Sequence, residues 1–545
     1  MIACLCQFLC LLCLFAATLH AQNDETRELW RIRSQTITDD LLKDATQLTP
    51  LRRAVLWTRL AQCWWKADQK RAKGWFQNAI DVVAQVPNKE NAADRADRLA
   101  TARNLLRIVS PLDQKLATAL VSLLKDADDQ WTVRDRSDNA DAMISAAISL
   151  VEQDPKRAAE LASVGLRLGP AVNFADVLFA LRKRDPKLAD ALFTEALSLA
   201  RQNLQPAMLS SLTYAAFPEH KDPRYSAFIP PENFRAEVLQ LDVAFLNANP
   251  INDENRNSIC FSIGDFIAPV LSEFENSNPQ QVTVVRQSIN QCRGVHPMVQ
   301  QELDRTLSDQ PLNTVEALLK GAADAKDVNV RTIYEYRAAV LAQEKKDYER
   351  ALKIMDGISK EGREFMGDSW ENIRWDWAAK GALEHYKAGR LLEMNLILNG
   401  VPDDLEPFAK AVFVDRLPEN RNPEGDPALQ FLNDARAGLR RSKARESERV
   451  GCYFLLLRSI VKYDPSAATT AIKEAFVALK RADEASQIKD RQTLDTGEYL
   501  EILPASLLEI DEFAVKEGIA SLTTVETRAQ LRLALLGAAL KRIKQ

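Results

Sequence analysis

The densest group of side chains capable of chemistry lies between Gly367 and Tyr386. Two tryptophans seven residues apart would share one face of a helix there. Aromatic rings beside carboxylates commonly hold sugars, and two carboxyl groups at a suitable separation hydrolyse glycosidic bonds. The group therefore suggests a carbohydrate-active or carbohydrate-binding all-helical toroid. Its candidate ligand residues are Asp368, Trp370, Glu371, Arg374, Asp376 and Trp377.

The same residues also fit an architectural interpretation. Large aromatic side chains usually pack in cores, and Glu371 and Arg374, three residues apart, would form an ordinary pair on a helix surface. The two interpretations differ in what they expect. The first places the acids beside the rings in a solvent-filled pocket, whereas the second buries the rings and turns the acids outward singly.

The rest of the sequence offers no familiar catalytic or cofactor motif. Beyond residues 1–21 its three histidines are far apart, and neither a His-Glu-x-x-His nor a Cys-x-x-Cys pair occurs there. A phosphate-binding Walker loop and a Gly-x-Ser-x-Gly elbow are also missing. Ser459 and Lys462 match the Ser-x-x-Lys pattern of penicillin-recognising enzymes. The second motif of those enzymes, Ser-Asp-Asn, begins at Ser137 and so comes before the first instead of after it, and no Lys-Thr-Gly follows. The sequence therefore assigns no catalytic, cofactor-binding or metal residue.

A short phrase recurs along the chain and indicates how its elements are built. It is an aspartate, often followed by Pro or Gln, then usually Lys, and then an alanine within a few residues. Asp is a good helix N-cap, and Pro is tolerated at the first helical position. Small and large apolar residues then alternate at i, i+4 and i+7, so one helix face would pack closely. The phrase begins at Asp68, Asp113, Asp154 and Asp185, with weaker copies at Asp347 and Asp464.

At these residues the chain resembles the tetratricopeptide-like superfamily of helix–turn–helix repeats. The stretch from Lys346 to Leu352 is similar to the turn between the two helices of that repeat. The glycine of its first helix is missing, since Ala338 and Ala339 occupy that area, and the spacing between phrases is irregular. The resemblance implies an all-α, irregular α-solenoid of antiparallel helical hairpins that binds protein or peptide partners. It implies no catalytic residue.

Composition agrees with a helical fold of more than one core. The 545 residues exceed what one core usually supports, and glycine and alternating β-branched runs are scarce. The net charge of −5, with acidic and basic residues intermixed, predicts no general attraction for nucleic acid. We therefore expect no nucleic-acid partner, and protein or peptide partners are what the resemblance implies.

Residues 1–21 have the pattern of a signal peptide with cleavage after Ala21. The apolar run from Leu9 to Leu19 is too short for a comfortable membrane span, and no later stretch is long enough. We therefore expect a secreted or periplasmic protein that is not integral to a membrane after cleavage. In an oxidising compartment Cys260 and Cys292 are the candidate disulfide, because both fall in the irregular central region.

The density of prolines divides the chain into segments. Ten of the 23 prolines fall between Pro206 and Pro311, where shorter helices and longer connections are expected. Near the C-terminus, Thr523 and Glu526 have the spacing of a capping box for a closing helix. The predicted segments are a signal peptide at 1–21, a helical-repeat region at 22–217, a Pro-rich irregular region at 218–311, helical hairpins at 312–401, a loop or hinge at 402–427 and a C-terminal helical region at 428–545.

Overall fold

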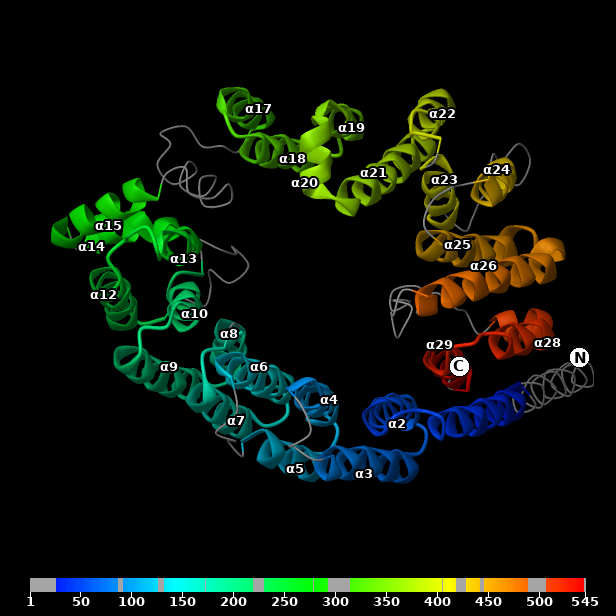
Figure 1. Cartoon of the computed structure of the whole chain (residues 1–545), viewed down its shortest axis with the longest axis horizontal. Helices are drawn as coiled ribbons and strands as arrows, with labels where there is room; N and C mark the ends of the chain where they lie inside the picture. The colour runs from blue at the N-terminus through cyan, green and yellow to red at the C-terminus, as the bar shows by residue number, and fades with distance from the viewer. Residues whose placement is uncertain are drawn as a thin grey trace, which may run out of the picture. The chain divides into compact units, whose positions relative to one another are not determined.

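The computed structural model is built of α-helices (Figure 1). It describes residues 26–86, 92–125, 132–171, 173–218, 230–277, 279–292, 314–403, 405–417, 428–441, 446–488 and 506–543. Across these ranges 25 α-helices have assigned bounds and no strand occurs. The all-α prediction is confirmed, and consecutive helices pack as pairs, consistent with a helical-repeat arrangement. The predicted signal peptide lies outside the described residues.

The chain forms two compact units. Unit 1 combines the residues up to Ala79 with those from Glu371 onward, and unit 2 is Ile80–Trp370. The boundaries fall inside α3 (Gln69–Gln85) and α21 (Asp368–Lys387). Besides these, unit 1 contains helical residues 26–45, α2 (Pro50–Trp64), α22 (Leu391–Asn399), α23 (Glu406–Asp415), α24 (Ala428–Arg441), α25 (Glu446–Tyr463), η4 (Pro465–Ala467), α26 (Ala468–Ile488), α28 (Ser506–Ala520) and α29 (Val525–Arg542).

Unit 2 contains the longer run of consecutive helices. Its middle holds an uninterrupted helical segment that changes type, from α13 through η2 and η3 to α14. Its elements are α4 (Ala92–Val109), α5 (Gln114–Lys125), α6 (Val133–Leu150), α7 (Pro155–Leu168), α8 (Phe174–Arg184), α9 (Pro186–Gln202), α10 (Pro206–Ala216), α12 (Glu232–Ala248), α13 (Arg256–Ser262), η2 (Ile263–Ile267), η3 (Ala268–Val270), α14 (Leu271–Ser277), α15 (Pro279–Gln291), α17 (Val315–Asp324), α18 (Val328–Glu344), α19 (Tyr348–Gly357) and α20 (Lys360–Met366).

An aspartate makes the joint between two helices at five of the six predicted phrases. The backbone N–H of Asp154 donates to the Leu150 carbonyl and so closes α6, while its carboxylate caps α7. Asp185 does the same between α8 and α9. At Asp464 the carboxylate instead accepts from the Ser466 hydroxyl, and a 3₁₀ turn follows. The capping donors at these five aspartates are the backbone N–H groups of Arg71, Lys115, Leu116, Arg157, Lys187, Leu188 and Arg350, at 3.0–3.2 Å.

The helix that follows each cap buries the predicted stripe of small and large residues. In α3, for example, Ala72, Phe76 and Ala79 are all fully buried. The alanines let the neighbouring helix approach, and the larger residue fills the space between, as close packing requires. The equivalent stripes Ala189, Phe193, Ala196 and Ala468, Ile472, Ala475 are buried as well.

The predicted loop or hinge at 402–427 is wrong for residues 406–415, which form α23. Proline misled the prediction, because Pro407 lies at the start of α23, where no intrahelical donor is needed. The side chains of Phe408 and Phe413 are buried and pack α23 into the core of unit 1. Residues 418–427 lie outside the described residues.

The predicted capping box at Thr523 and Glu526 also differs from the structure. Helix α29 begins at Val525 with Thr524 as N-cap, and no capping hydrogen bond comes from the Thr524 side chain. The backbone N–H groups of Thr523 and Thr524 instead donate to the carboxylate of Asp483 in α26, both at 2.9 Å. The start of α29 is therefore capped by another helix.

Candidate functional site

The two tryptophans of the predicted sugar-binding cluster are buried. Trp370 is 9% exposed and Trp377 is 6% exposed. The indole N–H of Trp370 donates to the carbonyl of Met355 at 3.1 Å, and the guanidinium of Arg363 lies 4.6 Å from the centre of its ring. Neither indole therefore offers an open ring face on which a sugar could stack.

Two charged members of the cluster have partners outside it. Arg374 is buried and donates to the Gly400 carbonyl at 3.1 Å, while Asp376 pairs with Lys380 and Arg416 at 2.7 and 2.8 Å. Glu371 is exposed. Asp368 begins α21, and the boundary between the two units falls after Trp370. Because the rings are buried and Asp376 is paired with two cations, the geometry lends no support to a carbohydrate site.

The described residues contain neither a metal-binding cluster nor a membrane-spanning helix. They contain no group of three or more His, Cys, Asp or Glu side chains able to hold a metal ion. Among the described helices, none is long and apolar enough to cross a membrane. A cavity with polar groups in its lining provides a candidate site.

Such a cavity lies in unit 2, between α10 and the segment that follows α13. One side is a single stripe of α10 at i, i+3, i+4 and i+7, and three of its four side chains carry a hydroxyl group. The other side comes from η2 and η3. The eight lining residues are Ser210, Thr213, Tyr214 and Phe217 from α10 and its end, and Asp265, Phe266, Pro269 and Val270 opposite.

The second wall exists because a proline disturbs the helix. Pro269 has no N–H to donate to the carbonyl of Asp265, four residues earlier, and its ring would crowd that carbonyl. The backbone responds by widening into a π-turn at Ile263–Ile267, closed by the N–H of Ala268 on the Ile263 carbonyl. A 3₁₀ turn over Ala268–Val270 then follows. Such π-turns often occur at functional sites, and this one positions Asp265 on the cavity.

A short hydrogen bond joins the two walls. The hydroxyl of Ser210 donates to Oδ2 of Asp265 at 2.6 Å, and both side chains are half-buried. Each wall also contributes one buried aromatic residue, Phe217 at the end of α10 and Phe266 in η2. The cavity thus combines one carboxylate, several hydroxyl groups and aromatic rings.

A fully buried aspartate contacts Thr213, one of the residues that line the cavity. Asp242 of α12 is 0% exposed, and its two carboxyl oxygens lie 3.3 and 3.2 Å from the hydroxyl of Thr213. Burial raises the pKa of Asp242 well above its ordinary range, and the hydrogen bond from Thr213 lowers it only in part. A buried acid with a strongly shifted pKa beside a cavity is a common mark of a functional site.

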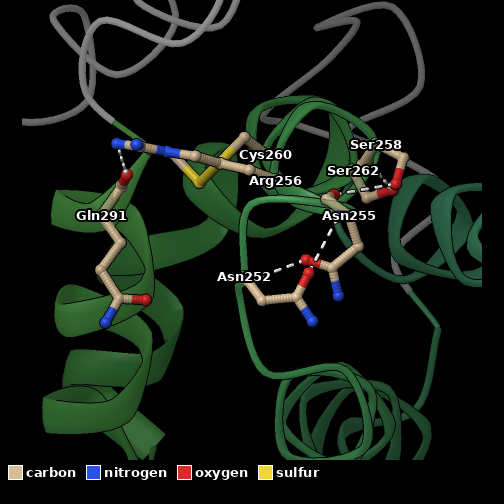
Figure 2. The surroundings of a disulfide bond; sticks show 8 residues. Asn252, Asn255, Arg256, Ser258, Cys260, Ser262 and Gln291 are labelled. Atoms are coloured by element: carbon tan, nitrogen blue, oxygen red, sulfur yellow. Dashed lines mark hydrogen bonds between the residues drawn. A yellow bond between two sulfur atoms is a disulfide. The ribbon is translucent and has the colours of Figure 1, made fainter.

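A disulfide holds the second wall in place. Cys260 of α13 is bonded to Cys292, directly after α15, and both residues are fully buried. One turn earlier, Arg256 donates to the Gln291 carbonyl at 3.0 Å, and Figure 2 shows its side chain running past the two sulfur atoms. Helix α13, which continues directly into the π-turn, is thereby tied twice to the end of α15.

The other two cysteines outside the predicted signal peptide do not take part. Cys452 is buried in α25, and Cys63 of α2 carries a free thiol. Burial raises the pKa of Cys63 to about 11, with Arg59 and Lys541 opposing that shift. Because the thiolate is the reactive form, Cys63 has little nucleophilic character near neutral pH.

Sequence reasoning missed the residues of this cavity, although one sign was present. Asp242 lies on the apolar stripe of α12, among Val238, Leu241 and Phe245, where a charged residue is unexpected. The cavity itself depends on helices that meet only in the fold. Comparison of the chain with protein-family models, curated proteins and solved structures finds no match.

Proposed function

We propose that the mature chain is a secreted or periplasmic scaffold, an irregular α-solenoid of the tetratricopeptide-like kind, that binds protein or peptide partners and catalyses no reaction. The observation that carries this proposal is the repeated joint. The same aspartate cap links successive helices at five places, and sequential helix pairs of this kind build extended binding surfaces.

An exposed apolar face supports partner binding by unit 1. Helix α22 buries Met394 and Leu398, yet Leu392 and Leu396 on another face are 70% and 64% exposed. Two leucines at i and i+4 present the spacing that an amphipathic helix offers to a partner. We therefore propose an apolar peptide segment, such as the face of an amphipathic helix, as the occupant of this surface.

Selection of peptides from a displayed library on immobilised residues 22–545 tests the proposal. We expect an enriched peptide family with apolar residues at helical spacing, whose binding is lost in the double variant Leu392→Glu, Leu396→Glu. The matched control is Val477→Glu, which also places a charge at an exposed apolar position of unit 1. Failure to enrich any family, or equal binding by both variants, would contradict the assignment to α22.

The proposed location rests on the signal-peptide pattern and on the disulfide, since such bonds persist in oxidising compartments. Residues 1–40 can be fused to alkaline phosphatase that lacks its own leader, an enzyme that becomes active only after export. We expect phosphatase activity and an N-terminus at Gln22. An inactive fusion would exclude export by this leader, whatever the mature chain binds.

A further inference from the structure

A lysine occupies the same place in three successive helix pairs of unit 2. Lys115, Lys156 and Lys187, here called the lysine row, are each the second residue of a helix, in α5, α7 and α9, directly after an aspartate joint. All three residues are exposed, and among the described residues no carboxylate pairs with any of their ammonium groups. The repeated joint therefore carries a repeated positive charge without an ion-pair partner.

The first turn of a helix is an unfavourable place for a lysine. The positive end of the helix dipole lies there, so acidic side chains stabilise this turn and basic ones destabilise it. The first turns of α5, α7 and α9 nevertheless contain no acidic residue. The stability of these helices therefore gives no reason for the lysine row, and a role at the surface does.

Contacts between the joints bring the lysine row to one edge of unit 2. The side chain of Gln153 donates to the carbonyl of Pro111 at 3.3 Å, which places the joint before α7 beside the joint before α5. Arg184, the last residue of α8, pairs with Glu152, which follows α6. This pair places the joint before α9 beside the joint before α7.

The acidic groups of the three joints are already engaged. The three cap aspartates accept backbone N–H groups, and Glu152 pairs with Arg184. Lys183, in the last turn of α8, is also exposed and adds a further cation beside the row. An ammonium group donates hydrogen bonds and accepts none, so a ligand must supply acceptors, and carboxylates satisfy both the hydrogen bonds and the charge.

The arrangement of the row favours an extended ligand. Helices that pack side by side lie about 8–10 Å apart, and an extended chain advances about 3.3 Å per residue. Carboxylates three residues apart in an extended segment would therefore meet successive lysines. Nucleic acid is disfavoured as the ligand, because the chain as a whole has a net charge of −5.

We infer that the lysine row binds an acidic segment of a protein or peptide partner, in extended conformation, with Asp or Glu at about every third position. The inference rests on the proposed function, since a protein or peptide carries the segment. It assigns to unit 2 a recognition site for negative charge, separate from the apolar face of α22 in unit 1.

Fluorescence anisotropy at low ionic strength tests this inference on residues 22–545. The probe is a labelled peptide that repeats Glu-Gly-Ser, and its uncharged counterpart repeats Gln-Gly-Ser. We expect the acidic peptide to bind, the uncharged one not to bind, and added salt to weaken binding, since exposed ion pairs are screened. Equal binding of the two peptides, or no binding of the acidic one, would overturn the inference.

Charge reversal makes the test specific to the row. The row variant carries Lys115→Glu, Lys156→Glu and Lys187→Glu. Its binding should weaken about tenfold or more, because three exposed ion pairs are lost and like charges replace them. The matched control reverses three exposed lysines of unit 2 outside the row, Lys320→Glu, Lys326→Glu and Lys353→Glu. The control has the same net charge and should bind like the wild type, and equal weakening in both variants would contradict the assignment.

Thermal melts separate lost binding from lost structure. Glutamate suits the first turn of a helix better than lysine does, so the row variant should melt at or above the wild-type temperature. If it melts early, the same three positions changed to glutamine provide the second variant, expected to weaken binding by severalfold. A single-stranded DNA oligonucleotide that displaces the acidic peptide from the row as well as unlabelled peptide does would overturn the assignment to a peptide.

The two proposals fail separately. Enrichment of apolar peptides in the library selection, without binding of the acidic peptide, would remove the row as a site and leave the scaffold function standing. Binding of the acidic peptide to a chain on which the selection enriches nothing would leave the row standing, and the proposed function would lose its apolar partner.

Discussion

Two fully buried aspartates, one in each unit, meet opposite surroundings. Asp483 in α26 of unit 1 receives four hydrogen bonds at 2.8–2.9 Å. Asp242 in α12 of unit 2 has Thr213 as its one hydrogen-bond partner in the described part of the chain, at 3.2–3.3 Å. Both residues are inaccessible to solvent, with 0% exposure.

The pKa values of the two groups shift in opposite directions. For Asp483, burial acts to raise the pKa, but the hydrogen bonds from Thr524, Thr523 and Thr527 outweigh it, and the pKa falls below its ordinary value. For Asp242, burial dominates and the pKa rises well above its ordinary value. The hydrogen bonds that Asp483 receives favour its ionised form, whereas burial favours the protonated form of Asp242.

This difference separates an architectural acid from a candidate functional one. Asp483 accepts the backbone N–H groups at the start of α29, which has no cap of its own. Its burial therefore serves to join α26 to α29. Asp242 caps no helix, and it adjoins a cavity that contains a second carboxylate. Strongly shifted acids of this kind gather at functional sites, which is why the candidate site is placed in unit 2.

Removal of the disulfide should produce the largest effect and should be confined to unit 2. Cys260 and Cys292 are 32 residues apart, and closing a loop of that length stabilises a fold by about 3–4 kcal/mol in the chain-entropy account. The double variant Cys260→Ala, Cys292→Ala should lose hydrogen-exchange protection in α13 and α15. Cys452→Ala, a single change at a buried cysteine of unit 1, is the control. Unchanged protection in α13 and α15 would mean that Arg256 and packing suffice to hold the cavity wall.

Asp483→Ala should destabilise unit 1 by about 2–4 kcal/mol, because buried donors at the start of α29 lose their acceptor. Tryptophan fluorescence during urea unfolding reports on this unit, since seven of the nine tryptophans belong to it. Asp464→Ala is the control. Its carboxylate caps no backbone N–H, so the expected loss is below about 0.5 kcal/mol. Similar losses in both variants would show that the hydrogen bonds between Asp483 and the start of α29 do not contribute specifically to stability.

Sequence patterns within one helical turn predicted the aspartate joints between helices, but they did not predict the cavity between α10 and η2. An N-cap depends on residues within one turn, so the phrase at Asp154 and Asp185 could be interpreted from sequence alone. The cap of α29 could not, since Asp483 lies 40 residues before Thr523. The same limit applied to the cavity, where Ser210 meets Asp265 across 55 residues. The tryptophan cluster was local and conspicuous, yet the rings of Trp370 and Trp377 are buried.

Asp242→Asn should stabilise unit 2 near neutral pH, by about 1 kcal/mol, because the fold must hold this buried acid protonated at a pH where the unfolded chain ionises it, whereas an amide is neutral in both states. The sign follows from the raised pKa of Asp242. Its contribution to stability is complete below the pKa of the unfolded chain, about 3.9, and is lost as pH rises through the folded value. The gain should therefore appear between the unfolded and folded pKa values and grow with pH.

Circular dichroism melts of the wild type and Asp242→Asn at pH 4 to 8 measure this difference, and Asp253→Asn, at an exposed position, is the control. Asp483 should behave in the opposite way. Its pKa is lowered, so its stabilisation is present above the unfolded pKa and is lost only as pH falls through the folded value. A gain for Asp242→Asn that stays constant with pH would show that Asp242 is not titrating in the way its burial implies.

A matched change of threonine to valine beside each aspartate tests the contrast between the two carboxyl groups directly. Thr527 donates to Asp483 at 2.9 Å and Thr213 contacts Asp242 at 3.2 Å, and both threonines are buried. Valine keeps the shape and removes the hydroxyl. Near neutral pH, Thr527→Val should cost about 1.5–3 kcal/mol because its bond reaches an ionised carboxylate, and Thr213→Val about 0.5–1.5 kcal/mol because a protonated acid binds it more weakly. Urea unfolding, followed by fluorescence for the first and by hydrogen exchange in α10 and α12 for the second, gives the two losses. Equal losses would mean that the two carboxyl groups carry the same charge, and the contrast between the units would then rest on geometry alone.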